Sequence, residues 1–363
     1  MTILTAAAFA ALAAEPQRLY LGVYTSPTCA GIQLADFDPD TGAVTNVRLA
    51  GKATNPSFLA MHPNGQFLYA IGEGGGGAAL AFRIDATTGL LEKLNQQVAG
   101  EGPCHVSLTP DAKVALVANY SGGTVASFPV NADGTLGPAA SRIAHVGSGP
   151  RKDRQPSPRA HSINSDPAGK FAFAADLGTD DIFVYRIGAG GVLTPHDPKS
   201  VRVPPGSGPR HFCFLPGGKY AYVINELANT IVAFRYDGAG KLEPFATVST
   251  LPDGVAPRSH TAEIVAHPSG KFIYGSNRGH DSIAMFRIDV ETGTPTFVGC
   301  QGEGIKEPRN FVIDPSGRWL LVGNQNSDSI VVFKIDQTTG MLTPVGTPTP
   351  CHKPVCLRFA VKS

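Results

Sequence analysis

The stretch from Gly208 to Glu226, GPRHFCFLPGGKYAYVINE, holds the densest group of chemically able side chains in the chain. Arg210 and His211 stand at its start and Glu226 at its end, separated by two strand-like runs that a Pro-Gly-Gly turn joins. An imidazole can take up or release a proton near neutral pH, a carboxylate can act as a base or orient a neighbour, and a guanidinium suits a phosphate, a carboxylate or a nascent oxyanion. These residues either form a site or merely belong to a structural repeat.

A repeat runs along the whole chain. The residues that open its units are 46 to 55 positions apart: Pro56, Pro103, Pro158, Pro209, Arg258, Pro308 and Pro354. A first turn that contains proline, such as LPGG at 215–218, occurs six times, and a later turn closed by glycine, such as ETG at 291–293, occurs seven times. Four short strands fit between consecutive openings. A period near 50 with four strands per unit is typical of propeller blades.

The two kinds of turn differ in number, and the difference predicts how the ring closes. The first glycine-closed turn, at 40–42, precedes any complete unit, and the last inner strand, at 355–361, has no strands after it. We therefore predict an all-β fold: a seven-bladed β-propeller of four-stranded antiparallel blades, with the last blade shared by the N- and C-terminal segments. The prediction covers residues 18–363 as one domain. Such closure leaves no open sheet edge.

The overall composition agrees with this fold and limits the classes of partner. Charged residues make up 16% of the chain, and its 42 glycines and 30 prolines are typical of many short strands joined by tight turns. The formal charge of +1 leaves no net field for nucleic acid or anionic lipid. After the first fourteen residues, no run approaches the length of a membrane-spanning helix. We expect no nucleic-acid partner and no membrane span.

Two features bear on the compartment. Residues 1–14, MTILTAAAFAALAA, resemble the hydrophobic part of a signal peptide, but they lack its basic start, so an apolar disordered terminus is the alternative. Export would place the protein in the periplasm or outside the cell; without it the protein is cytoplasmic. Export would also favour disulfides among Cys29, Cys104, Cys213, Cys300, Cys351 and Cys356, whereas buried thiols are the simpler expectation for Cys104, Cys213 and Cys356.

The predicted fold gathers polar residues at one mouth of the central channel. Inner strands begin, and second strands end, on the same face of a propeller. His105, His161 and His211 stand near the starts of inner strands, and Glu226 and Arg278 stand at the ends of second strands. Several polar groups around a concave channel are the default hypothesis for a ligand site. The longest connection, 143–157, is rich in basic residues and is expected to overhang this mouth, either as a lid that recruits an anion or as a solvated loop.

Five motifs in register identify a family resemblance. ANYSGGTV (118–125), RQPSPRAHS (154–162), ADLGTDDIFVY (175–185), GPRHFCFLPGGKYAYVINE (208–226) and SNRGHDSIAMF (276–286) together resemble the seven-bladed lactonase family. That family includes the propeller-type 6-phosphogluconolactonase and the fungal carboxy-muconate lactonising enzyme. The likeness runs from about residue 18 to the end of the chain. It implies a propeller enzyme that acts on lactones.

The resemblance also implies site residues. Matching the family's motifs places the catalytic group at His161, Arg210, Glu226 and Arg278. We expect substrate-binding roles for Arg159, His211, His105, Asn277 and Arg309. One departure bears on the substrate: the family's Pro-His-x-His is Pro158-Arg159-Ala160-His161 here, which adds positive charge to the mouth.

Three functions follow as hypotheses. The first is hydrolysis of an anionic lactone, with 6-phosphogluconolactone as the best single candidate. The second is the reverse kind of chemistry, ring closure of a muconate-type diacid by a cycloisomerase. The third is a non-catalytic exported propeller that binds a sugar acid or a protein partner, which the sequence does not identify. No zinc or calcium spacing and no cofactor-binding motif is present, so we predict neither a metal nor a cofactor.

Overall fold

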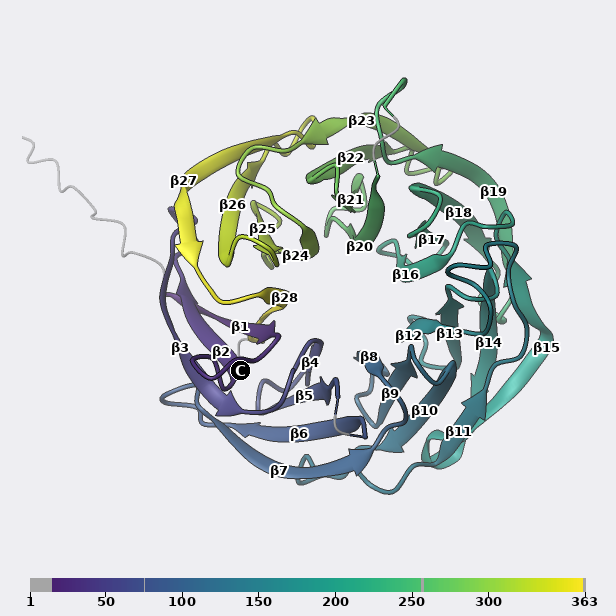
Figure 1. The fold of residues 1–363 in the computed structure, drawn as a ribbon, viewed down its shortest axis with the longest axis horizontal. Coiled ribbons are helices and arrows are strands. Elements are labelled where there is room, and N and C mark those ends of the chain that lie inside the picture. Colours follow the sequence, from purple (N-terminus) through teal and green to yellow (C-terminus); the bar gives the residue numbers. More distant parts are fainter. Residues whose placement is uncertain (1–14, 75, 256–257, 362–363) are drawn as a thin grey trace, which may run out of the picture.

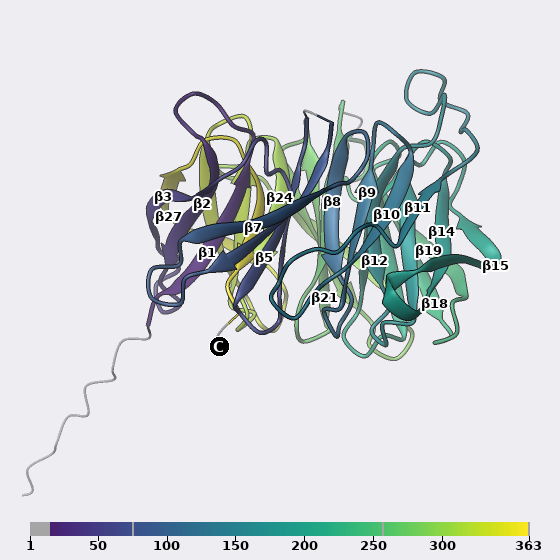
Figure 2. The same cartoon turned by 90° about the horizontal axis from the view of Figure 1, so that it is seen from below.

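The computed structural model describes residues 15–74, 76–255 and 258–361, and it forms a ring of seven four-stranded antiparallel sheets around a central channel (Figure 1). The proposed leader, residues 1–14, lies outside this range. Seen edge-on, the strands run between the two faces of the ring (Figure 2). The predicted seven-bladed propeller is confirmed. Within the described ranges, no helix is long and apolar enough to cross a membrane.

Six blades are each built from four consecutive strands, with the innermost strand first. They are β4–β7 (Leu59–Met61, Phe67–Gly72, Ala78–Ile84, Leu91–Val98), β8–β11 (Pro103–Leu108, Val114–Asn119, Thr124–Pro129, Ser141–Ala144), β12–β15 (Ala160–Ser165, Phe171–Asp176, Asp181–Ile187, Leu193–Arg202), β16–β19 (Pro209–Phe214, Tyr220–Asn225, Thr230–Tyr236, Leu242–Ser249), β20–β23 (His260–Ala266, Phe272–Arg278, Ser282–Ile288, Pro295–Gln301) and β24–β27 (Pro308–Ile313, Trp319–Asn324, Ser329–Ile335, Leu342–Pro350). A short 3₁₀ turn, η1 (Ala189–Gly191), precedes β15.

The seventh blade joins the two ends of the chain, as predicted. Its outer strands are β1 (Gln17–Val23), β2 (Gly31–Phe37) and β3 (Val44–Lys52), and its inner strand is β28 (Pro354–Phe359). β28 pairs antiparallel with β1, so that Leu357 lies opposite Leu21. The predicted inner strand was placed one residue late at its start and two at its end. The chain leaves the inner strand after Phe359.

Buried tyrosines connect neighbouring blades through the glycine-closed turns of the repeat. The hydroxyl groups donate hydrogen bonds to carbonyl oxygens of the next blade: Tyr20 to Gly89, Tyr69 to Gly134, Tyr222 to Gly293 and Tyr274 to Gly340, at 2.6 to 3.0 Å. Gly340 has φ +76°, and a Cβ there would lie 2.5 Å from the Phe272 ring. Glycine is therefore required at that turn by both backbone conformation and contact. The repeated glycines fix how the blades stack.

The cysteines are free thiols in the described structure. Cys104 and Cys356 are buried, as expected for inert thiols, whereas Cys213 is only partly buried and differs from that expectation. Burial raises the pKa of Cys104 to about 12, which keeps the thiol protonated at neutral pH.

The closure of the ring predicts a strong effect of Leu357→Ala. Leu357 is fully buried in the core between β28 and the β24–β27 blade. Removing its side chain should lower the free energy of unfolding by about 2–5 kcal/mol, because a buried leucine leaves a cavity. Leu90→Ala is the matched control: Leu90 is 45% exposed, and its loss should cost about 0.5 kcal/mol or less. Urea unfolding measures both; equal losses in the two variants would contradict a closing role for β28.

Candidate active site

The predicted residues converge at one mouth of the channel because of their positions in the blade repeat. His161, Arg210 and Arg309 are each the second residue of an inner strand, on β12, β16 and β24. Arg278 ends the second strand β21, and Glu226 directly follows the second strand β17. Since the inner strand starts where the second strand ends, the two sets meet on the same face. Four different blades therefore supply one site.

Glu226 is the centre of this site. Its carboxylate accepts hydrogen bonds from Arg210 Nε at 3.0 Å and Arg278 Nη2 at 2.8 Å on Oε2, and from Arg154 Nη2 on Oε1. The Glu226 side chain is only 6% exposed. Burial alone would raise its pKa, but Arg278, Arg210 and Arg154 together lower it to about 2. Glu226 is thus ionised at neutral pH and is a poor base, so its geometry favours a role in orienting the arginines.

Arg210 is held from a second side by His211 and the backbone. Its Nη1 donates to the Ala262 carbonyl at 2.7 Å and contacts His211 Nε2 at 3.2 Å, and its side chain is 2% exposed. Burial and the neighbouring Arg278 and Arg309 lower the pKa of Arg210 to about 9, which still leaves it charged at neutral pH. His211 Nδ1 lies 2.8 Å from Glu263 Oε1. With Nε2 accepting from Arg210, Nδ1 must carry the proton, so both ring nitrogens of His211 are engaged within the protein. The arrangement makes His211 a support for Arg210.

His161 lies beside the carboxylate with an uncommitted ring face. Its Nε2 is 4.0 Å from Glu226 Oε2, and its ring packs edge-on against Tyr120 at 5.2 Å between centroids. Burial, with the charges of Arg210, His211 and Arg309 acting in the same direction, lowers the pKa of His161 well below 6.5. The imidazole is therefore neutral at physiological pH. A neutral imidazole next to an ionised carboxylate can accept a proton and have the resulting charge stabilised.

A second carboxylate stands across the mouth. Glu73 Oε2 accepts hydrogen bonds from Ser57 Oγ at 2.6 Å and from Tyr24 Oη at 3.1 Å. The Arg309 guanidinium lies 5.7 Å from the centroid of the Tyr24 ring. Glu73 and Tyr24 also line an open hollow of about 470 Å³ at this mouth. Sequence reasoning missed Tyr24 and Ser57, although Tyr24 follows the second strand β1 as Glu226 follows β17, and Ser57 follows Pro56 as Arg210 follows Pro209.

Arg154 was also missed, although the sequence contained a signal for it. The long β11–β12 connection, which was expected to overhang the mouth, brings Arg154 onto Glu226. The loop is anchored by Gln155, whose buried amide donates to Asp180 Oδ1 at 2.7 Å and to the Leu177 carbonyl at 2.9 Å. Its length and basic composition indicated a role at the mouth, but not which arginine would reach the centre.

Three predicted binding residues lie away from Glu226. Arg159 donates to the Ser121 carbonyl at 3.0 Å and stacks on the Tyr120 ring, which itself packs against His161. Asn277 is fully buried, and its amide donates to the Thr250 carbonyl and to Ser282 Oγ. His105 lies deeper in the channel, packed against Phe58 at 4.4 Å between centroids. The structure thus places Arg159 at the rim, Asn277 in the framework of its blade and His105 below the site.

Arg278 has a donor to spare. Its Nη2 is shared between Glu226 and the Thr261 carbonyl, but its Nε is buried with no hydrogen-bond acceptor among the described residues. An unpaired buried donor on a charged group is costly unless a ligand or water satisfies it. Nη1 also has no acceptor among the described residues and, unlike Nε, is not a buried atom, so Arg278 can offer it to a substrate oxygen. In the part of the chain that the structure describes, no three His, Cys, Asp or Glu side chains group as a metal site would require.

The buried carboxylate predicts a large stability cost for Glu226→Gln. Neutralising it leaves Arg210 and Arg278 buried without their counter-charge, which should cost about 3–5 kcal/mol. Because the folded pKa of Glu226 is depressed to about 2, its contribution is complete above the unfolded pKa near 4.5 and fades as the pH falls toward 2. Urea unfolding at pH 7 and pH 3 measures both effects. Glu92→Gln, at a pair where Glu92 is 71% exposed, is the control, and a similar cost there would refute the argument.

Comparisons with known proteins agree with the fold and the motifs. Residues 18–359 match the family model described as "Lactonase, 7-bladed beta-propeller". A 6-phosphogluconolactonase of Bacillus subtilis is 39% identical over 299 residues, 81% of this chain and 84% of the relative. One from Formosa agariphila is 34% identical over 78% of this chain and 82% of its own. The solved structure of a periplasmic gluconolactonase of Pseudomonas aeruginosa has a TM-score of 0.90 and 34% identity over 95% of this chain and 99% of that chain. The chain belongs to the seven-bladed β-propeller lactonase family.

Proposed function

We propose that this protein is a lactone hydrolase that opens an anionic sugar-acid lactone, with 6-phosphogluconolactone as the best candidate, at the mouth around Glu226. The observation that carries the proposal is the pairing of a neutral, buried His161 with an ionised Glu226 whose arginines retain free donor capacity. The names of the relatives support the lactonase activity.

The charge of the mouth supports an anionic substrate. Five arginines gather there against three carboxylates, Glu226, Glu73 and Glu101, the last of which lines the hollow beside Glu73. The arginines are Arg154, Arg159, Arg210, Arg278 and Arg309. Guanidinium groups bind phosphate and carboxylate oxygens in a bidentate way. The excess of positive charge is local, since the chain as a whole carries only +1. It would attract a phosphorylated or carboxylated ligand to this mouth in preference to the rest of the surface.

The proposed reaction uses His161 as the base. Nε2 of His161 removes a proton from a water as the water oxygen attacks the lactone carbonyl carbon. Arg278, whose Nη1 has no acceptor among the described residues, stabilises the negative charge that develops on the carbonyl oxygen. The tetrahedral intermediate then collapses with cleavage of the ring C–O bond, and the imidazolium returns its proton to the departing alkoxide. Glu226, 4.0 Å from Nε2, stabilises the imidazolium while it exists. The product is the open-chain hydroxy acid.

A second candidate substrate is the unphosphorylated lactone. The periplasmic gluconolactonase structure, 34% identical to this chain, motivates it. Arg159 separates the two candidates, because it stacks on Tyr120 at the rim, beyond His161, and has no carboxylate partner among the described residues. A phosphate at the far end of a six-carbon lactone needs a cation at some distance from the reacting carbonyl, and Arg159 meets that requirement.

The low pKa of His161 predicts the pH dependence of the reaction. The active form is the neutral imidazole, so kcat/KM should stay constant from about pH 8 down to 6.5 and should fall only at lower pH, as His161 becomes protonated. His161→Ala should lower kcat about 100-fold or more and abolish this acid limb. The rates are measured on freshly made lactone after subtraction of spontaneous hydrolysis. An acid limb that persists in His161→Ala would assign it to another group.

The role of Arg159 is tested by comparing two lactones. Arg159→Gln should raise KM for 6-phosphogluconolactone roughly tenfold or more, the effect of losing one charge-assisted contact, and leave KM for glucono-δ-lactone nearly unchanged. Arg142→Gln is the matched control, because Arg142 also stacks on an aromatic ring and donates to backbone carbonyls but stands on the outer strand β11. An equal change for both lactones would contradict phosphate recognition by Arg159.

A further inference from the structure

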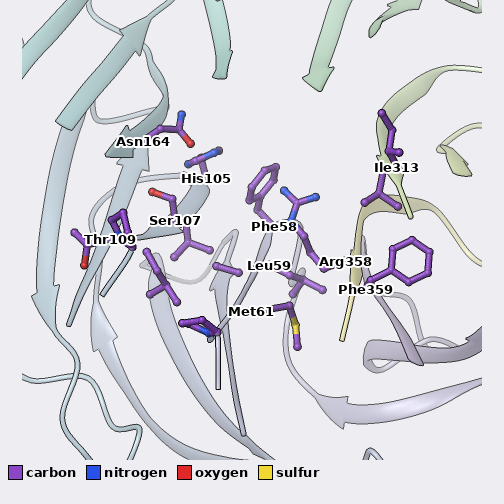
Figure 3. A pocket seen from close by; sticks show the side chains of 16 residues that line it. Phe58, Leu59, Met61, His105, Ser107, Thr109, Asn164, Ile313, Arg358 and Phe359 are labelled. Atoms are coloured by element: carbon purple, nitrogen blue, oxygen red, sulfur yellow. The ribbon is translucent and has the colours of Figure 1, made fainter. Parts of the chain in front are cut away.

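A second cavity lies at the opposite end of the channel from Glu226. It has a volume of about 500 Å³ and is lined by residues of five inner strands, β4, β8, β12, β24 and β28, and by the turn residues Pro63 and Pro110 (Figure 3). The Phe58 ring separates it from the catalytic side, since Phe58 also lines a small space of about 10 Å³ next to Arg210 and Arg309. The cavity is therefore distinct from the proposed active site.

The cavity contains a cation but no carboxylate in its lining. Arg358, on β28, extends into it, stacked 4.8 Å from the centroid of the Phe58 ring (Figure 3). Its Nη1 donates to the Leu357 carbonyl, and no carboxylate of the described residues lies within ion-pair distance. The charge of Arg358 helps to lower the pKa of Glu263, but the Glu263 carboxylate is already hydrogen-bonded to His211 and Asn310. Arg358 thus offers most of its donors to the cavity.

Two further donors on the opposite wall have no partner. The backbone N–H of Ile163 donates to His105 Nδ1 at 3.4 Å. Burial, with help from His211 and Arg358, lowers the pKa of His105 well below 6.5, so the neutral ring carries its proton on Nε2. The Asn164 amide nitrogen is buried without an acceptor among the described residues. His105 and Asn164 lie together on one side of the Phe58 ring, and Arg358 lies on its other side (Figure 3).

We propose that this cavity binds a small monocarboxylate with an apolar body. One guanidinium matches one negative charge, which fits a single carboxylate bound at Arg358. His105 Nε2, on the other side of the Phe58 ring, is available to a further polar atom of the ligand. A phosphate would leave charge uncompensated with a single cation. The rest of the lining is largely apolar, including Met61, Val312, Ile313 and Phe359, and it would bury the body of the ligand. The proposal does not depend on the lactonase activity, because it uses no residue at the Glu226 mouth.

The test uses benzoate as the probe and methyl-¹³C-methionine as the reporter. Besides Met1, the chain has only Met61, Met285 and Met341, and Met61 alone lines the cavity. Benzoate should shift the Met61 methyl resonance in a saturable way and leave those of Met285 and Met341 in place, while the uncharged benzamide should shift none. Met61→Leu assigns the signal. No saturable shift of Met61 with benzoate up to about 50 mM, which would reveal even weak millimolar affinity, overturns the proposal.

Variants separate this site from the arginine-rich mouth. Arg358→Gln should raise the benzoate Kd reported by Met61 about tenfold or more. Asn164→Asp keeps the side-chain shape but adds a repelling charge, so it should have the same effect and serves if Arg358→Gln does not fold. Arg278→Met, at the other mouth, should leave the Kd unchanged. Unchanged affinity in Asn164→Asp, or loss of affinity in Arg278→Met, would contradict a site at this end of the channel.

Discussion

The structure around the channel depends on one buried carboxylate. Glu226 balances Arg210, Arg278 and Arg154, three guanidinium groups that would otherwise repel one another at close range. Isolated charges are very costly in a protein interior, and they persist only where paired and hydrogen-bonded. Because the three arginines come from two blades and a loop, this one interaction also ties together segments that are distant in sequence. The chemistry available at the mouth follows from that balance.

The same balance assigns different tasks to groups that look alike in the sequence. His161 and His211 both occupy early positions of inner strands, yet one has an uncommitted face beside Glu226 and the other is bonded on both nitrogens. Glu226 and Glu263 are both buried acids, but one faces the mouth and the other supports His211 from below. The site is thus layered: reacting groups lie at the surface of the channel, and supporting groups lie one step deeper.

The sequence was sufficient for the fold and for the centre of the candidate site. The period near 50 and the unequal turn counts predicted seven blades and the shared closure, because both are local consequences of strand and turn chemistry. Family motifs brought His161, Arg210, Glu226 and Arg278 together. The repeat pattern and the motifs do not predict the direction in which a side chain points. Asn277 and His105 were both expected to bind substrate, but Asn277 is buried in hydrogen bonds to Thr250 and Ser282, and His105 lies deeper in the channel. Arg154 reaches the site from a connection, where no repeat position predicts its orientation. Tyr24 and Ser57 occupy the repeat positions of Glu226 and Arg210, but without a charge they did not stand out in the sequence.

The inner strand β28 is the last strand that the structure describes, and it completes the blade to which β1, β2 and β3 belong. During synthesis, six blades can therefore form while the channel is still open to one side. The backbone hydrogen bond from Ala360 to Arg18 brings the two ends together, so the ring has no structurally privileged starting blade. A gene rearranged to begin in another blade, with the present ends joined by a short linker, would encode the same ring. Evolution can therefore move the chain ends of such a protein to another blade without altering the site that the ring encloses.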